Sequence, residues 1–211
     1  MDKFDIFLSV GATSTPAQET FVRAVEDRLR SEGLTPRTVG RNTFGSDAPL
    51  KTVTDLMDTC AGAVVVALER TYFPEGVDRR GGPKERKLAD VRLPTPWNHI
   101  EAAMAYSRKL PLLVIVENNL KSEGLLEPSY DWYVQRIDPT PQSLNGDEFN
   151  GVLSNWKMKL AKRPALSAAP AELTIGQIVA NLKPAQLYGA LVALSGAIGG
   201  AFLLGGKMFG H

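Results

Sequence analysis

The segment TPWNHIEAAMAY at 95–106 places one carboxylic acid in apolar surroundings. Trp97 and Glu101 lie four residues apart, so on a helix they share one face. A carboxylate beside an aromatic wall at a cleft can stabilise a developing positive charge or move a proton. Glutamate is rarely buried, however, and a solvated glutamate on an exposed helix would have no chemical role. The sequence around Glu101 leaves both interpretations open.

Two further groups are of types that bind a phosphate or a ribose. The backbone of Ser9, Val10 and Gly11 lies at the end of the first apolar run, and Arg41 lies in a polar loop after the second. In open parallel sheets, ligands bind beyond the carboxyl ends of the strands, where these groups would lie. Neither group is specific by itself. The loops at these strand ends contain no P-loop, HExxH, GxSxG or GxGxxG motif.

Cysteine and histidine are scarce, which narrows the possible chemistry. Cys60 is the only cysteine, and the two histidines are His99 and His211. We therefore expect no internal disulfide, no metal site and no cofactor. Cys60 is expected to be a core residue, and His99 to point away from Glu101. The net charge of +1 gives no support for a nucleic-acid partner.

The elements that must position these groups alternate between strands and helices. A hydrophobic content of 44% and a charged content of 22% predict a folded domain. Apolar runs predict strands at 5–10, 36–39, 63–68 and 112–116, with an edge strand at 133–137. Apolar spacing and capping residues predict a helix ending near Gly33 and helices at 50–60, 96–109 and 147–162. This alternation predicts an α/β fold with a parallel sheet covered by helices on both faces.

Two other segments have few residues to bury. The segment 73–93 is rich in charged residues, glycine and proline, and is predicted to be a mobile surface loop. From 164 to 170 the composition changes to proline, alanine and serine, which is typical of a linker. A weak helical segment is predicted after it, at 172–183.

The last part of the sequence has the composition of a membrane span. Residues 184–206 contain no charged residue, and Lys183 and Lys207 flank them. As a helix this stretch rises ~34 Å, about the hydrocarbon thickness of a bilayer. Basic residues are more numerous before the span than after it, which predicts a single-pass inner-membrane protein with its domain in the cytoplasm. The expected parts are a domain at 1–163, a linker with a short helix at 164–183, a transmembrane helix at 184–206 and a short tail at 207–211.

Small residues recur along one face of this predicted span. They are Gly189, Ala193, Ala197, Ala201 and Gly205, with Gly196 and Gly200 beside them. Such a face lets helices pack closely in lipid, so we expect the span to self-associate. The alternative is a span of ordinary composition, because glycine is frequent in membrane helices.

The order of these segments resembles a TIR domain. The resemblance rests on DIFLS in the first strand, the loop at 40–49, AVVVAL, and the W-x-x-x-E of WNHIEAAMAY followed by PLLVIV. It covers about residues 4–162 and is greatest to the TIR-like domains of bacterial immune effectors. It implies a flavodoxin-like domain with a central parallel sheet flanked by helices, here followed by one transmembrane helix. Enzymes of this kind cleave the nicotinamide–ribose bond of NAD+ or build signalling nucleotides from the products.

The resemblance also implies roles for single residues. Glu101 takes the position of the catalytic glutamate, Ser9 lies near the nucleotide, and Trp97 lines the pocket. Residues 40–49 take the place of a loop that docks onto a neighbouring subunit, with Arg41 and Phe44 as substrate-binding candidates. The long segment 73–93 departs from the compact TIR pattern.

We therefore expect a membrane-anchored NAD+ glycohydrolase that acts in antiphage defence and is active on oligomerisation. Its expected partners are NAD+, membrane lipid and further copies of itself, bound through the TIR domain and the transmembrane helix. Constitutive NAD+ loss would kill the cell, so we also expect an off state that a nucleotide signal or a protein activator releases. One alternative is a non-catalytic TIR adaptor or membrane-perturbing effector. Another is a TIR enzyme that makes a cyclic ADP-ribose-like messenger.

Overall fold

The computed structural model describes residues 4–128 and 132–162. Within these ranges, five strands form one parallel sheet in the order β2-β1-β3-β6-β7. The strands are β1 (Phe4–Val10), β2 (Leu34–Arg37), β3 (Gly62–Ala67), β6 (Leu112–Glu117) and β7 (Tyr133–Ile137). Counted along the chain, this is the order 2-1-3-4-5 of flavodoxin-like sheets, which confirms the predicted α/β class. The strand order reverses between β1 and β3, and the ends of these strands open a crevice there.

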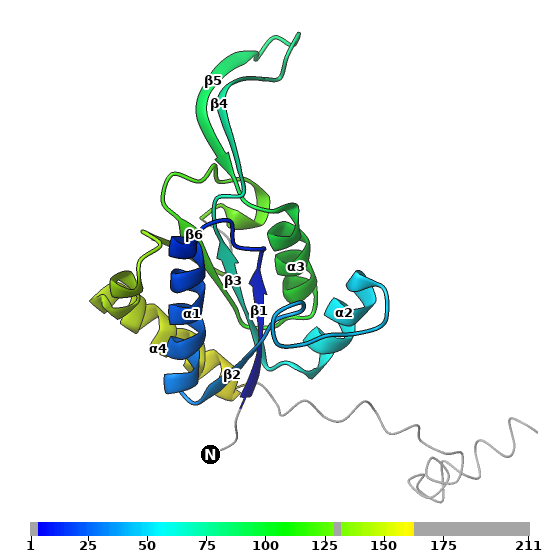
Figure 1. The fold of residues 1–211 in the computed structure, drawn as a ribbon, viewed down its shortest axis with the longest axis vertical. Helices are drawn as coiled ribbons and strands as arrows, with labels where there is room; N and C mark the ends of the chain where they lie inside the picture. The colour runs from blue at the N-terminus through cyan, green and yellow to red at the C-terminus, as the bar shows by residue number, and fades with distance from the viewer. Residues whose placement is uncertain (1–3, 129–131, 163–211) are drawn as a thin grey trace, which may run out of the picture. The chain divides into compact units, whose positions relative to one another are not determined.

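Continuous apolar runs place the central strands inside the domain. All six residues of β3 and the first five of β6 are buried, as expected for strands covered on both faces. One core cluster joins the sheet to α1 (Pro16–Ser31) and α4 (Asp147–Lys162). The other joins it to α2 (Pro49–Thr59) and α3 (Pro96–Ser107) and includes Cys60. Figure 1 shows the two pairs of helices on opposite faces of the sheet.

The starts of α1 and α3 follow the same sequence signal. The Oγ1 atom of Thr15 accepts a hydrogen bond from the Gln18 backbone N–H at 3.2 Å, and that of Thr95 accepts one from Trp97 at 3.4 Å. A proline follows each threonine at the first helical position, where its missing N–H costs nothing. Two short 3-10 helices, η1 (Gly124–Leu126) and η2 (Pro141–Asn145), were not predicted.

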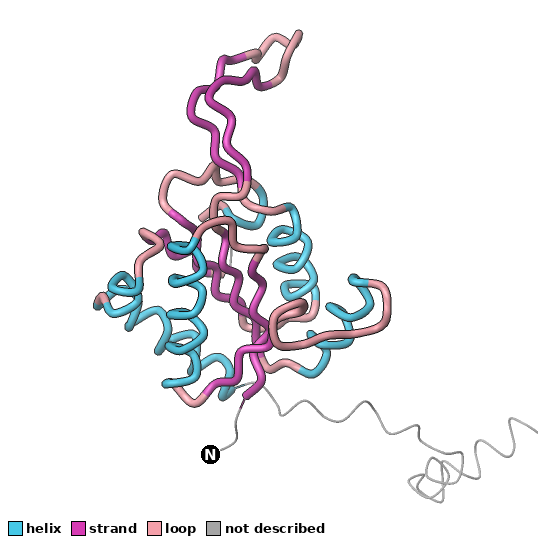
Figure 2. Tube along the Cα trace, viewed as in Figure 1, coloured by secondary structure: helices cyan, strands magenta, loops and turns pink. Residues whose placement is uncertain are grey.

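The prediction of a surface loop at 73–93 is wrong. The segment forms an antiparallel hairpin of β4 (Thr71–Asp78) and β5 (Arg86–Leu93), which extends away from the main sheet (Figures 1 and 2). Cross-strand contacts hold it together, such as the Asp78–Arg86 ion pair at 2.8 Å and the hydrogen bond from Tyr72 to Asp90 at 2.7 Å. Backbone pairing between two strands needs no burial, because the inward-facing N–H and C=O groups bond across the pair and the outward-facing ones are left to solvent. A prediction from apolar runs therefore misses such strands.

The predicted linker at 164–183 and the predicted transmembrane helix at 184–206 lie outside the described residues. So do all seven small residues expected on the helix-packing face. Among residues 4–128 and 132–162, no helix has the length and apolar character needed to cross a membrane.

Candidate active site

The first turns of α3 lie against the carboxyl end of β1, and this contact positions Glu101. At Gly11, just beyond β1, an added Cβ atom would lie 2.9 Å from Cγ2 of Thr95, the residue that caps α3. A residue with a side chain at position 11 would therefore push the helix start away from the strand. Asn98, in the first turn, is 1% exposed. Glu101 lies three residues later on the same helix face.

A chain of hydrogen bonds links the sheet to the Glu101 carboxyl group. Nδ2 of Asn98 donates to Oγ of Ser9 at 3.1 Å and to the carbonyl oxygen of Val66 at 3.3 Å. The Ser9 hydroxyl also hydrogen-bonds the carboxyl group of Glu101. Because Ser9 Oγ accepts from Asn98, its single proton is left to be donated to Glu101. The amide of Asn98 thereby fixes the direction of the hydrogen bond that the carboxyl group receives.

Burial sets the protonation of this carboxyl group. Loss of hydration raises the pKa of Glu101 from 4.5 to about 7, while the hydrogen bond from Ser9 acts in the opposite direction by stabilising the carboxylate. At neutral pH both the acid and the carboxylate are therefore populated. A group in this state can serve as a proton donor, as a base or as a negative charge beside a developing cation.

A cavity of about 290 Å³ lies directly at Glu101. The end of β1 and the loop after it contribute Val10, Gly11 and Ala12, and the first turns of α3 contribute Trp97 and Glu101. The remaining wall is formed by Val39, Pro49, Val53, Arg70 and Thr95. Glu101 and Arg70 are the charged side chains of this lining, and most of the others are apolar. A small apolar cavity with two opposite charges is typical of a site for a compact polar ligand.

The structure brings together four of the predicted site residues. Gly11, Trp97 and Glu101 line the cavity, and Ser9 contacts Glu101 from the strand below it. Trp97 is 41% exposed, so the indole forms an open wall and is not part of the core.

Arg41 and Phe44 lie elsewhere. Two guanidinium nitrogens of Arg41 donate to the carboxylate of Glu19 at 2.9 and 3.0 Å, and its Nε donates to Glu26 at 3.3 Å. Arg41 also makes the largest contribution to lowering the pKa of Glu19 to about 2. Phe44 is 78% exposed, and neither residue lines the Glu101 cavity. Within this domain, these two ion pairs hold the loop that carries Arg41 against α1.

Sequence reasoning missed Asn98 and Arg70. A signal for Asn98 was present, because it precedes Glu101 by three residues and so shares its helix face. Arg70 follows the buried strand AVVVAL at the carboxyl edge of the sheet, where a charged residue is a ligand candidate. Neither residue belongs to a recognised motif.

Two possible reactive groups are absent from this cavity. The thiol of Cys60 is buried in the core, and burial raises its pKa to about 12, so it is protonated at neutral pH. In the part of the chain that the structure describes, no three His, Cys, Asp or Glu side chains are grouped so as to hold a metal ion.

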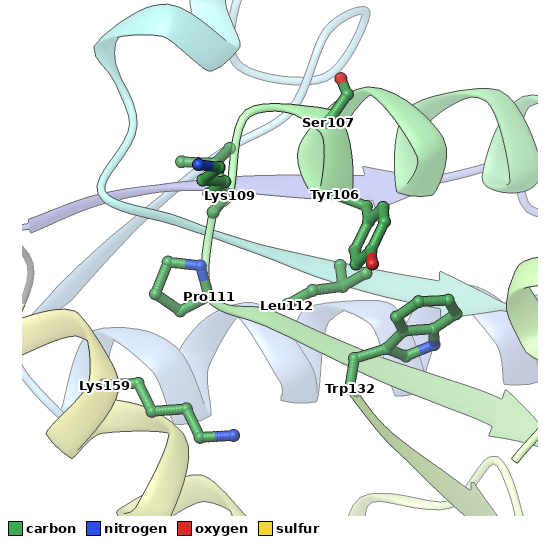
Figure 3. A pocket seen from close by; sticks show the side chains of 8 residues that line it. Tyr106, Ser107, Lys109, Pro111, Leu112, Trp132 and Lys159 are labelled. Carbon is green, nitrogen blue, oxygen red and sulfur yellow. The ribbon is translucent and has the colours of Figure 1, made fainter. Parts of the chain in front are cut away.

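A larger cavity, of about 550 Å³, lies at the other end of α3 (Figure 3). Tyr106 and Trp132 line it with their ring centroids 5.0 Å apart, and Lys109 and Lys159 reach it from two sides. Among the residues that the structure describes, its lining contains no carboxyl group, and it includes Leu112, where β6 begins. Ligands of such sheets bind at the carboxyl ends of the strands, so the chemistry favours the smaller cavity at Glu101.

No family model matches the sequence, and no curated protein matches it. Several solved structures are similar to this chain, among them the following two. One is a CMP N-glycosidase, BcmB, from Clostridium botulinum, with 13% identity, 72% of this chain and 98% of that chain covered, and a TM-score of 0.42. The other is the TIR domains of the activated Roq1 resistosome, which recognises the pathogen effector XopQ, with 13% identity, 76% and 74% of the chains covered, and a TM-score of 0.35.

Proposed function

We propose that this protein is a TIR-type N-glycosidase that hydrolyses the nicotinamide–ribose bond of NAD+. The observation that carries the proposal is the half-buried Glu101 carboxyl group at the cavity, held by Ser9 and walled by Trp97. An open aromatic side chain offers a flat surface for a nicotinamide ring. The sequence resemblance to TIR domains supports the choice of NAD+ among N-glycosides.

The reaction needs little more than a well-placed negative charge. The bond from ribose C1′ to the nicotinamide nitrogen breaks, its electron pair stays on that nitrogen, and neutral nicotinamide leaves. The ribose becomes oxocarbenium-like, and the Glu101 carboxylate stabilises this positive charge. Water then adds to C1′ and releases one proton, which gives ADP-ribose, nicotinamide and H+. Nicotinamide carries its positive charge in the substrate, so its departure requires no general acid.

A second candidate substrate is an N-glycoside with a neutral nucleobase. Its leaving group must be protonated, and the observation that favours it is the pKa of about 7, which keeps much of Glu101 in the acid form at neutral pH. The two candidates require opposite protonation states of the same group. The pH dependence of the reaction therefore distinguishes them.

Replacing Glu101 by Gln tests the proposal. The substitution removes the negative charge and keeps the size of the side chain. We therefore expect the rate of nicotinamide release from NAD+ to fall by about 100-fold or more, as for loss of a key electrostatic group. The rate is measured by chromatography with the purified full chain. Glu75→Gln is the matched control, because Glu75 lies exposed in β4, outside the cavity lining. Equal rates for wild type and Glu101→Gln would refute catalysis by this residue.

We also propose that the chain is anchored in the inner membrane through 184–206 and acts in antiphage defence. Cellular NAD+ during phage challenge, compared between wild type and Glu101→Gln, extends the same test to cells. If cells die while NAD+ is retained, the adaptor or membrane-perturbing alternative is favoured. Mass spectrometry of the product separates ADP-ribose from a cyclic messenger.

A further inference from the structure

Arg70 brings a positive charge to the Glu101 cavity, and its side chain is exposed. Its guanidinium group has a single hydrogen bond within residues 4–128 and 132–162, from Nη1 to the carbonyl oxygen of Ala12 at 3.4 Å. The carboxylate next to it in sequence, on Glu69, pairs with Arg92 at 3.3 Å. No described carboxylate forms an ion pair with Arg70, although it lies in a domain where most arginines are paired.

Backbone donors lie beside this guanidinium group. The N–H groups of Ala12 and Thr13 donate to no acceptor in the described ranges, and they follow β1 in a segment without regular structure. Gly11 and Ala12 line the cavity together with Arg70. Successive backbone N–H groups next to an arginine form a site suited to an anion with several acceptor oxygens.

The residues that line two neighbouring cavities show on which side of the Glu101 cavity Arg70 and the backbone N–H groups lie. A second, water-sized cavity of about 10 Å³ shares five lining residues with the Glu101 cavity: Val10, Gly11, Ala12, Arg70 and Thr95. Trp97 and Glu101 line the Glu101 cavity and not this second one. The Glu101 cavity therefore has an acidic, aromatic side on α3 and a cationic side at Arg70. A ligand that fills it presents a positive centre at one side and an anion at the other.

We infer that Arg70 and the backbone N–H groups of Ala12 and Thr13 bind a phosphate carried by the ribose of the substrate. The site thus selects nucleotides, in which C1′ bears the base and C5′ bears the phosphate, over free nucleosides. This inference rests on the proposed function, because Glu101 must act on C1′ for the phosphate to fall at Arg70. A planar guanidinium group can bind two phosphate oxygens at once, which fixes the ribose relative to the carboxylate.

The test compares nicotinamide mononucleotide with nicotinamide riboside, which differ only in the phosphate. With the full chain in detergent, the wild type is expected to have a higher kcat/KM for the mononucleotide. In Arg70→Ala, the ratio of the two kcat/KM values is expected to fall about tenfold, as for loss of a charge-assisted hydrogen bond from an exposed side chain. Arg70→Lys should restore part of the ratio. Arg80→Ala, at the exposed hairpin turn, is the control for loss of one positive charge.

An unchanged ratio in Arg70→Ala, or a wild type that cleaves both compounds equally well, would overturn the inference. A binding measurement separates this failure from failure of the proposed function. Binding of nicotinamide mononucleotide to Glu101→Gln is measured by calorimetry, with and without Arg70→Ala. A Kd that rises tenfold or more with Arg70→Ala supports the phosphate site even if the wild type cleaves none of these compounds. Equal Kd values would refute the site even if the enzyme is active.

Discussion

At the scale of single residues, the site depends on a conflict between burial and charge at Glu101. Burial disfavours the carboxylate that the proposed reaction uses, and the hydrogen bond from Ser9 partly restores it. Asn98 contributes through Ser9, since its Nδ2 donates to the hydroxyl oxygen and leaves the hydroxyl proton for Glu101. The pH dependence of catalysis is therefore a property of these three side chains together.

For NAD+, kcat/KM is expected to rise with pH and level off above about 7, because the carboxylate is the active form and the Glu101 pKa is raised to about 7. Ser9→Ala removes the hydrogen bond that lowers this pKa, so the midpoint of the pH profile should move upward. Rates of nicotinamide release between pH 5 and 9 measure it. Ser31→Ala, on the exposed end of α1, is the control. A rate that falls as the pH rises through 7 would favour the neutral-base substrate instead.

How far the sequence predicts this site depends on the distance between partners along the chain. Trp97 and Glu101 are neighbours through helical spacing, so their common face was predictable. Arg41 was assigned to the ligand because its loop lies at a strand end. Its actual partners, Glu19 and Glu26, lie 22 and 15 residues away in sequence on α1. Only the packing of α1 beside the loop shows that this arginine is already paired.

At the scale of elements, close packing of α4 against β3 depends on a residue without a side chain. A Cβ atom added at Gly62 would overlap Cδ2 of Leu160 and lie 3.2 Å from the Pro111 carbonyl oxygen. Backbone on one side and a fully buried leucine on the other leave little room for adjustment. The distance between helix and sheet is therefore set at this point.

Gly62→Ala is expected to lower the free energy of unfolding by about 1–3 kcal/mol through overpacking. Gly151→Ala is the matched control, because Gly151 lies in α4 with no heavy atom near an added Cβ. That change should stabilise the domain by about 0.5–1 kcal/mol through helix propensity. Urea unfolding of both variants measures the difference. A Gly62→Ala protein as stable as the wild type would show that α4 can move away from the sheet.

The sheet and its four long helices were predictable from apolar periodicity, because each of them buries one face or both. The hairpin of β4 and β5 was not, since most of its side chains are exposed and its strands are held by each other. The 3-10 helices η1 and η2 are too short for any periodicity to show.

At the scale of the whole molecule, membrane attachment is expected to come from residues 184–206, which contain no charged residue and are long enough to span a bilayer as a helix. Leu194→Arg combined with Ile198→Arg places two charges in the predicted span, each costing about 2.5–3.5 kcal/mol at the centre of a helix. Fractionation of cells should find the wild type with the membranes and the double variant largely released. Leu194→Ala with Ile198→Ala is the control. A double arginine variant that stays with the membranes would contradict the predicted span.

The base of the hairpin has a practical consequence for labelling the protein. The backbone N–H of Arg70 donates to the carbonyl oxygen of Leu93 at 2.8 Å, and Thr71 pairs with Leu93, so the two chain segments that enter and leave the hairpin are clasped together. Arg70 and Thr95, which line the Glu101 cavity, lie at the base of the hairpin, outside its paired strands. A fluorophore or an affinity tag attached at the turn near Gly81 would lie at the end of the hairpin. None of the hairpin residues 71–93 lines the Glu101 cavity. The hairpin turn is therefore a position at which the intact protein can be labelled while the residues of the Glu101 cavity stay unchanged.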